Sequence, residues 1–113
     1  MAADAIFAKK GTDIVLLDVE EAFLLSDIFV IATGTSRPHV QALADHVEER
    51  LKEEAGIKPL RVEGRAEAEW VLIDYGDIIV HLFQEPAREY YSLERLWGDA
   101  ERVRWEEPAV TDL

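Results

Sequence analysis

Three histidines supply the imidazole groups that proteins use to bind metal ions and to transfer protons near neutral pH. Two of them, His39 and His46, are seven residues apart in a segment with helical periodicity. That spacing places them on one side of a helix but about 10 Å apart along its axis, too far for one ion. No neighbouring carboxylate completes a set of ligands. We therefore expect no metal site, and we interpret His39 as a residue at the start of the helix.

A Thr-Gly-Thr-Ser turn at residues 33–36 lies between an expected strand and an expected helix, where backbone amides can hold an anion. Nucleotidyltransferases use a comparable Gly-Ser turn, but they also need a pair of carboxylates on an adjacent strand to hold magnesium. Here the next strand, PLRVEG, offers only Glu63, and Asp74 and Asp77 flank a turn. A helix cap explains the segment better. A nucleotidyltransferase-like enzyme remains the alternative hypothesis.

Nucleophilic catalysis has still less support. The chain contains no cysteine, so it has neither a thiolate nucleophile nor a disulfide. No serine is partnered by a recognisable base. The sequence therefore predicts no catalytic residue, no cofactor and no enzymatic activity.

The charge of the chain favours a protein partner of opposite sign. Twenty-four acidic residues against 12 basic ones give a formal net charge of −12 over 113 residues. Such a field repels phosphate backbones and anionic lipid, so we expect no direct readout of nucleic acid and no membrane binding. A basic protein surface is the natural counterpart. The competing interpretation, that the charge serves only solubility, stays open.

The chain has the length of one domain, and its 49% of hydrophobic residues are enough to build a core. No apolar run approaches the roughly 18 residues of a membrane span. The first ten residues, MAADAIFAKK, lack the apolar stretch of a signal peptide and the arginines of a transit peptide. We expect a cytoplasmic protein.

Hydrophobic periodicity predicts a single α/β domain with a mixed five-stranded sheet packed by helices. The expected strands cover residues 13–19, 28–33, 60–62, 70–75 and 78–83. Apolar residues at spacings of three and four predict a helix that follows Ser36 and ends at Gly56. Residues 1–10 can add one or two helical turns, and Pro86 opens a last helix. We assign residues 1–99 to the domain and residues 100–113 to a loosely held C-terminal tail.

The last two expected strands form a hairpin, because only Gly76 and Asp77 separate them. Side chains alternate along a strand, so this turn determines which residues share a face. One face pairs Tyr75 with Ile78, Ile73 with Val80, and Val71 with Leu82, and it has the composition of a core. The other face pairs Trp70 with Phe83, Leu72 with His81, and Asp74 with Ile79.

This second face combines a large aromatic area with a carboxylate and an imidazole, as binding surfaces do. We predict that Trp70 and Phe83 are neighbours on an exposed surface, with Asp74 nearer the turn and His81 beside Leu72. A helix that covers the face is the alternative, and it would make His81 a buried, hydrogen-bonded histidine.

Several segments follow one another as they do in a known family. They are DIVLLDV, SDIFVIATGTSRPHVQALADHVEE, PLRVEG and EWVLIDYGDIIVHLFQEPAREYYSLERLWGD, and they span roughly residues 9–99. The most specific parts are TGTS followed by His39, then VEG, WVLIDYGDIIVH and LERLWGD. In these motifs the chain resembles the ribosomal silencing factors, also called the Iojap family.

The resemblance implies a nucleotidyltransferase-like fold without the catalytic carboxylates. It also implies binding to the large ribosomal subunit through a basic ribosomal protein of the L-fourteen family. By occupying that surface, such a factor blocks joining of the small subunit and represses translation under nutrient limitation. Organellar relatives take part in large-subunit assembly, which is a second alternative. Self-association as a homodimer stays open.

The family's binding surface includes the tryptophan and the aspartate of the WVLID motif, which are Trp70 and Asp74 here. With their neighbours on the hairpin, the predicted contact set comprises Trp70, Leu72, Asp74, Tyr75, His81 and Phe83. The function we expect is that of a non-enzymatic ribosome anti-association factor.

Overall fold

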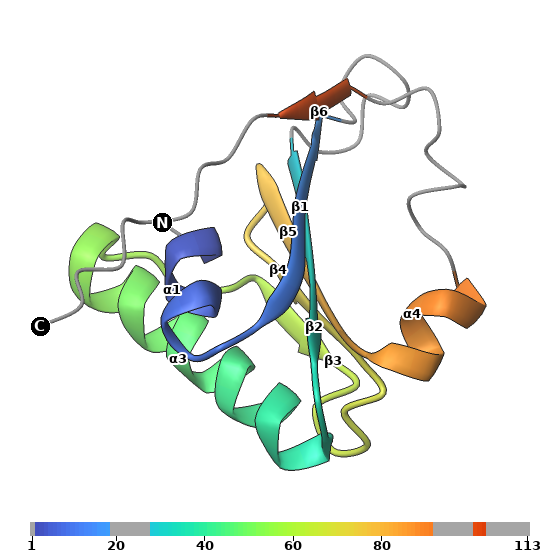
Figure 1. Ribbon diagram of the computed structural model, residues 1–113. Helices are drawn as coiled ribbons and strands as arrows, with labels where there is room; N and C mark the ends of the chain where they lie inside the picture. The colour runs from blue at the N-terminus through green and yellow to red at the C-terminus, as the bar shows by residue number, and fades with distance from the viewer. Residues whose placement is uncertain (1, 19–27, 92–100, 104–113) are drawn as a thin grey trace, which may run out of the picture.

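Figure 1 shows the computed structural model, which describes residues 2–18, 28–91 and 101–103. The helices are α1 (Ala2–Ala8), α3 (Arg37–Ala55) and α4 (Glu85–Tyr91). The strands are β1 (Thr12–Asp18), β2 (Ile28–Gly34), β3 (Arg61–Glu63), β4 (Trp70–Asp74), β5 (Ile78–Gln84) and β6 (Glu101–Val103). None of the helices in these ranges is both long enough and apolar enough to cross a lipid bilayer.

The strands form one mixed sheet in the order β3-β4-β5-β2-β1-β6. Neighbouring strands are antiparallel except β2 and β5, which run parallel. β2 and β3, which the long helix connects, run in the same direction with β5 and β4 between them. All five predicted strands are present, and the single α/β domain with a mixed sheet is confirmed.

A sixth strand extends the sheet beyond the prediction. β6 pairs with the outer edge of β1, where Leu16 lies opposite Val103 and Asp18 opposite Glu101. It falls in the segment that we predicted to be a loosely held tail, so that prediction is wrong for residues 101–103. The pairing uses backbone groups that the edge strand β1 leaves open, so it depends on a neighbour that is remote in the sequence and not on a local pattern. The domain boundary at residue 99 stays a prediction.

The long helix α3 forms where its apolar stripe and its caps predict it. Ser36 caps its N-terminus, and its side chain accepts the backbone N–H of His39 at 3.2 Å. Gly56 ends the helix with a left-handed φ of 68°, which a residue without a Cβ adopts readily. The apolar stripe is buried: Val40, Leu43, Ala44, Val47 and Leu51. The last helix begins at Glu85, and the part predicted beyond Tyr91 lies outside the described residues.

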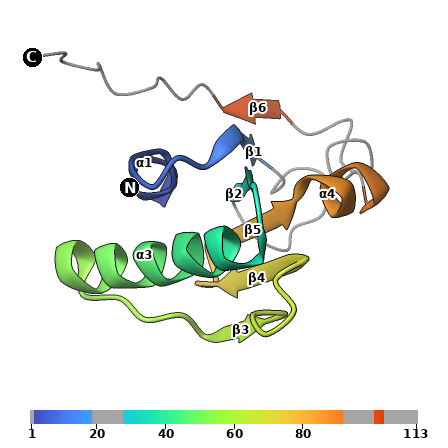
Figure 2. The same cartoon turned by 60° about the horizontal axis from the view of Figure 1, so that its bottom comes forward.

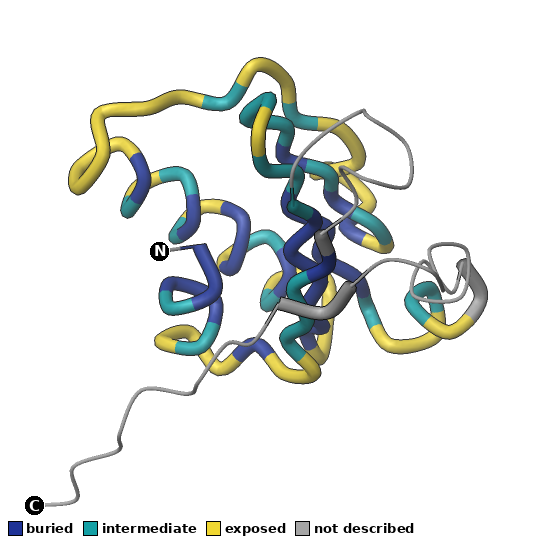
Figure 3. The backbone as a smooth tube through the Cα atoms, turned by 90° about the horizontal axis from the view of Figure 1, so that it is seen from above, coloured by how far each residue is buried: buried dark blue, intermediate teal, exposed yellow. Residues whose placement is uncertain are grey.

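Helices cover the two faces of the sheet unequally (Figures 1 and 2). The first, called the α3 face below, carries α1 and α3 over an aliphatic core that includes Val30, Val71 and Leu82. The opposite side, called the α4 face, carries α4 at one end, and Ala87 of this helix packs against it. Figure 3 shows burial concentrated in the central strands and along one side of α3. The segment 56–61 that leads from α3 into β3 is largely exposed.

Candidate partner-binding face

The β4–β5 hairpin has the predicted register. Trp70 pairs with Phe83, Leu72 with His81, and Asp74 with Ile79. At the turn, Gly76 adopts a positive φ of 89°, and the backbone N–H of Tyr75 donates to the carbonyl of Ile78 at 2.9 Å. The Asp74 carboxylate accepts the Gly76 N–H at 2.8 Å, which stabilises the tight connection.

The hairpin residues on the α3 face belong to the core, as alternation predicts. Val71, Ile73, Val80 and Leu82 have no exposed surface, and Tyr75 packs partly buried against them. Tyr75 therefore does not lie with Trp70, although we included both in the predicted contact set. Burial, with a smaller effect of the Glu48 charge, raises the pKa of the Tyr75 phenol to about 12. Its buried hydroxyl oxygen has no hydrogen-bond partner among the described residues.

On the α4 face, aromatic rings from three strands form one cluster. Trp70 stacks on Phe83 with ring centroids 5.2 Å apart and an angle of 26° between the planes. The His81 ring lies 4.6 Å from Phe29 and 5.8 Å from Trp70. Buried side chains of β1 and β2, Leu17 and Ile31, continue this layer across the sheet. The hairpin's aromatic residues are thus part of a second core.

The predicted exposure of this cluster is wrong for two of its members. Phe83 has no exposed surface and His81 is only 3% exposed, whereas Trp70, Leu72 and Asp74 are half-buried. The physical reason is the parallel pairing of β2 with β5, which brings Phe29 and Ile31 beside the hairpin. The surface that remains accessible in the predicted set runs along β4, with Phe83 and His81 beneath it.

α4 is anchored to the same face by Arg88. Its guanidinium donates to the hydroxyl of Thr33 at 2.7 Å and to the backbone carbonyl of Asp13. These bonds connect the helix to the ends of β1 and β2, and Ala87 beside Arg88 contributes to the apolar layer. No local sequence pattern predicts a role for Arg88, because its partners are 55 and 75 residues away along the chain.

His81 accepts a hydrogen bond from inside the cluster. The indole Nε1–H of Trp70 donates to its Nδ1 at 3.0 Å. Because Nδ1 accepts this bond, the neutral ring carries its proton on Nε2, which meets no acceptor within the described part of the chain. Burial lowers the pKa of His81 from 6.5 to about 4, so the ring is neutral at physiological pH.

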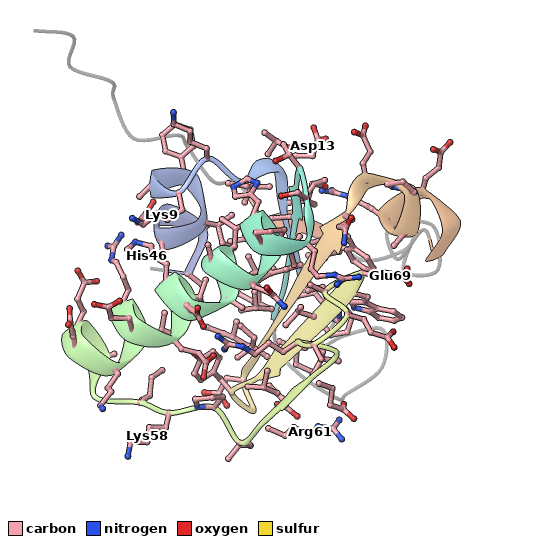
Figure 4. The ribbon with its side chains drawn as sticks, turned by 90° about the horizontal axis from the view of Figure 1, so that it is seen from below. Lys9, Asp13, His46, Lys58, Arg61 and Glu69 are labelled. Carbon is pink, nitrogen blue, oxygen red and sulfur yellow. The ribbon has the colours of Figure 1, made fainter. Side chains whose placement is uncertain are left out.

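Asp74 is paired within the protein as well as half-buried. One carboxylate oxygen accepts the Gly76 N–H and the other lies 3.3 Å from the Nε of Arg61. Arg61 also lies 3.7 Å from the carboxylate of Glu63, and both of these side chains are 60% exposed. Figure 4 shows Arg61 at the outer edge of the sheet. Arg61 was not among the predicted site residues; its pairing follows from the β3–β4 register that places it opposite Asp74.

The glycine of the VEG motif, Gly64, lies in the loop before Trp70, where there is no room for a side chain. Gly64 has a φ of 79°, and a Cβ there would lie 2.1 Å from the backbone carbonyl oxygen of Trp70. The loop is held on α3 by Arg65, which pairs with Asp45 and, at 3.3 Å, with Glu48. A side chain at residue 64 would therefore displace the strand end that carries the indole.

The TGTS turn at residues 33–36 acts as a helix cap. The backbone N–H of Thr35 donates to the Nδ1 of His39 at 2.9 Å, and the His39 N–H donates to Ser36. The other ring nitrogen of His39 donates to the carbonyl of Lys9 at 2.7 Å, which joins the end of α1 to the start of α3. These two amides are used inside the protein and not presented to an anion. Nowhere in the described ranges do three metal-binding side chains come together.

Comparison with known proteins identifies relatives over almost the whole chain. Residues 1–112 match the family described as ribosomal silencing factor during starvation. The ribosomal silencing factor RsfS of Halalkalibacterium halodurans is 43% identical over 106 residues, which cover 94% of this chain and 90% of that protein. RsfS of Bacillus subtilis is 45% identical over 100 residues, or 88% of this chain and 84% of the relative.

More distant relatives and solved structures agree. A mouse protein named mitochondrial assembly of ribosomal large subunit protein 1 is 29% identical, over 86% of this chain and 43% of its own length. A crystal structure from Chromobacterium violaceum superimposes with a TM-score of 0.82 at 39% identity, covering 96% of this chain and 84% of that one. On these matches, the chain belongs to the family of ribosomal silencing factors.

Proposed function

We propose that this protein is a ribosome anti-association factor that docks on the large ribosomal subunit and blocks joining of the small subunit. Translation would then fall under nutrient limitation. The proposed decrease in translation is based on the family, whose members include proteins named ribosomal silencing factors. Occupying a joining surface requires no catalysis, because mass action decides how many subunits are blocked. The role we propose is therefore cytoplasmic and non-enzymatic.

The observation that carries this proposal is the support beneath Trp70. The indole is half-buried and stacks on a Phe83 ring that has no exposed surface, so it rests on a rigid base. Rigid aromatic anchors of this kind dominate the binding energy of many interfaces. Leu72 and Asp74 follow Trp70 at alternate positions of β4. We propose that these three side chains contact the partner, while His81 and Phe83 support them from below.

The partner we propose is a basic ribosomal protein of the L-fourteen family. A net charge of −12 attracts a basic surface and speeds encounter with it. The same charge disfavours direct readout of ribosomal RNA. The identity of the partner comes from the resemblance of the motifs to the family, and charge complementarity supports it.

Subunit joining gives the direct test. Purified protein is added in excess to separated subunits under conditions that favour joining, and the mixture is run on a gradient. We expect the peak of joined ribosomes to shrink and the protein to sediment with the large subunit. An unchanged peak with no protein on either subunit would refute the proposed function.

Replacing Trp70 by alanine tests the contact face. Loss of a central aromatic anchor should weaken binding to large subunits at least roughly thirtyfold. Because the indole is half-buried, the free energy of unfolding should also fall by about 1–3 kcal/mol, which leaves a folded protein to assay. Leu60→Ala is the matched control, since Leu60 is 74% exposed and lies outside the proposed contact set. Equal affinities of the two variants would show that the wrong face was chosen.

A role in large-subunit assembly is the second candidate, and the printed name of the mouse relative favours it. The two roles differ in what depletion of the protein causes. An assembly factor leaves immature large subunits when it is removed during growth. A silencing factor leaves mature subunits and more joined ribosomes in starved cells. Gradients of lysates from both conditions separate the two.

A further inference from the structure

His81 is a polar ring at a position where an apolar ring would pack equally well. It is 3% exposed, and its neighbours in the cluster include Phe29, Trp70 and Phe83 at centroid distances of 4.6, 5.8 and 6.4 Å. Leu72 lies opposite it on β4. Packing against these described neighbours does not require a nitrogen atom.

The hydrogen bonds of His81 are satisfied on one side only. Nδ1 accepts the indole N–H of Trp70 at 3.0 Å, and the proton on Nε2 has no acceptor among the residues that the structure describes. A buried donor without a partner destabilises a fold, and a phenylalanine would avoid that loss. What histidine does here, and phenylalanine cannot, is accept the indole N–H.

We infer that His81 is a positioning residue that holds the indole of Trp70 in the orientation in which it meets the partner. The inference rests on the proposed function, because it takes Trp70 to be a contact residue. A side chain fixed before binding loses less conformational entropy in the complex. The bond is diagonal across the hairpin, since Trp70 pairs with Phe83 and His81 with Leu72, and it thus selects one orientation of the ring.

The same bond restricts the chemistry of the group that meets Trp70. With its only N–H donated to His81, the indole offers the partner ring surface and no hydrogen-bond donor. Ring faces attract arginine and lysine side chains through the cation–π interaction. A partner carbonyl or carboxylate therefore gains no hydrogen bond from the indole, and we take the group that docks against Trp70 to be a basic side chain. A basic side chain agrees with the charge of the partner that we propose.

Two substitutions separate positioning from packing. His81→Phe keeps a ring of similar size and removes the acceptor, whereas His81→Asn is smaller but offers an oxygen near the place of Nδ1. Each full-length variant is assayed for binding to large subunits and for its melting temperature. The indole N–H signal of Trp70 is followed in ¹H–¹⁵N spectra and assigned among the three tryptophans by its loss in Trp70→Phe.

We expect His81→Phe to shift the Trp70 indole signal and to weaken binding about fivefold, as for one buried hydrogen bond. His81→Asn should retain the signal near its original position and recover most of the affinity, even if it melts earlier than His81→Phe. A variant that melts earlier but binds more tightly is the result expected for positioning. If His81 served packing alone, the variant with the lower melting temperature would also bind more weakly. A shifted indole signal with unchanged affinity would overturn the inference.

Trp70→Phe provides a second route should His81→Phe fail to fold. It removes the donor, keeps a smaller aromatic ring, and should weaken binding by at least the factor of His81→Phe, because part of the contact surface is lost as well. In a protein that already carries His81→Asn, the same change should have the full effect, since the acceptor is still present. If the parental protein does not bind large subunits at all, the proposed function is contradicted. If it binds, and its affinity does not change when the Trp70–His81 bond is removed, only this inference is contradicted.

Discussion

The two faces of the sheet are both buried in part, but they are built from different side chains. The α3 face is aliphatic, with Val71, Ile73 and Val80 under α1 and α3. The α4 face is aromatic and polar, with the stacked Trp70 and Phe83 around His81. A stability core alone does not require that difference. We take the second face to have a further task, which is to present the β4 side chains to the partner proposed above.

The two faces can also be compared by the buried polar atoms of the hairpin that have no described hydrogen-bond partner. Each face holds one buried polar side-chain atom of the hairpin without a partner in the described ranges, the Tyr75 hydroxyl and His81 Nε2. On the α4 face the other nitrogen of the ring holds the indole of Trp70, so the unpaired atom accompanies a specific bond. On the α3 face, Tyr75 has no second polar side-chain atom, so its unpaired hydroxyl accompanies no such bond.

The largest expected effect tests whether the α4 face is a true core. Phe83 has no exposed surface, so Phe83→Ala should lower the free energy of unfolding by about 3–5 kcal/mol. Leu43→Ala on the α3 face should cost about 2–5 kcal/mol. Urea unfolding of the two variants compares the faces directly. A loss below about 1 kcal/mol for Phe83→Ala would mean that its cover is loose and the aromatic face opens readily.

The next effect is a pH dependence confined to the α4 face. The pKa of His81 falls from 6.5 to about 4 on folding because the ring is buried. Between these two pH values, the unfolded chain therefore binds a proton at His81 that the folded protein does not bind. Titration of His81 therefore leaves the free energy of unfolding unchanged above about pH 6.5. As the pH falls toward 4, it lowers that free energy by up to about 3 kcal/mol.

Unfolding free energies measured at several pH values between 7 and 4 check this expectation. Carboxylates also titrate near pH 4, so the quantity to compare is the difference between the parent and His81→Phe. The parent should lose more stability than the variant over this window. Parallel curves would mean that the ring reaches water when it is protonated.

Much of the fold follows from local sequence patterns, and the missed parts depend on remote neighbours. Alternation and the Gly76–Asp77 turn predicted the hairpin register correctly, because both signals are local. The burial of Phe83 and His81 could not be predicted this way, since it depends on β2 lying beside β5. The order of strands in a sheet leaves no local pattern in the sequence.

The candidate site was predictable to the same extent. Trp70, Leu72 and Asp74 lie where alternation along β4 puts them. The same alternation places Tyr75 on the α3 face. Including Tyr75 in the contact set was therefore inconsistent with the assumption that the contact residues share one face with Trp70. Arg61 was missed because its pairing with Asp74 depends on the β3–β4 register, which was not predicted although the strand itself was.

A smaller effect is expected from the α3 face. Tyr75→Phe removes a buried hydroxyl that has no hydrogen-bond partner in the described structure. The free energy of unfolding should stay unchanged or rise by up to about 1 kcal/mol. Thermal melts of the parent and the variant measure this difference. A decrease of about 1 kcal/mol or more would show that the hydroxyl makes a bond after all, with Glu48 the first residue to examine because its charge raises the Tyr75 pKa.

The smallest expected effect concerns the charge at the edge of the α4 face. Arg61 occupies one oxygen of Asp74, so a basic side chain of the partner has to compete with it. Arg61→Ala should therefore tighten binding to the proposed L-fourteen-family partner by about two- to fivefold, the range expected for an exposed ion pair. Lys58→Ala is the control, because it changes the net charge equally, from −12 to −13, in the same exposed segment.

Association and dissociation rates measured at low and high salt separate the two ways in which Arg61→Ala can act. The added negative charge speeds association of both variants, and salt removes that gain, because exposed charges are screened beyond a Debye length of roughly 8 Å at physiological ionic strength. Only Arg61→Ala frees the Asp74 carboxylate, so it alone should also slow dissociation, and this part should persist as salt rises. Identical rates for the two variants would mean that the partner does not use Asp74. Weaker binding of Arg61→Ala would mean that Arg61 itself touches the partner, and the contact surface would then extend from β4 onto β3.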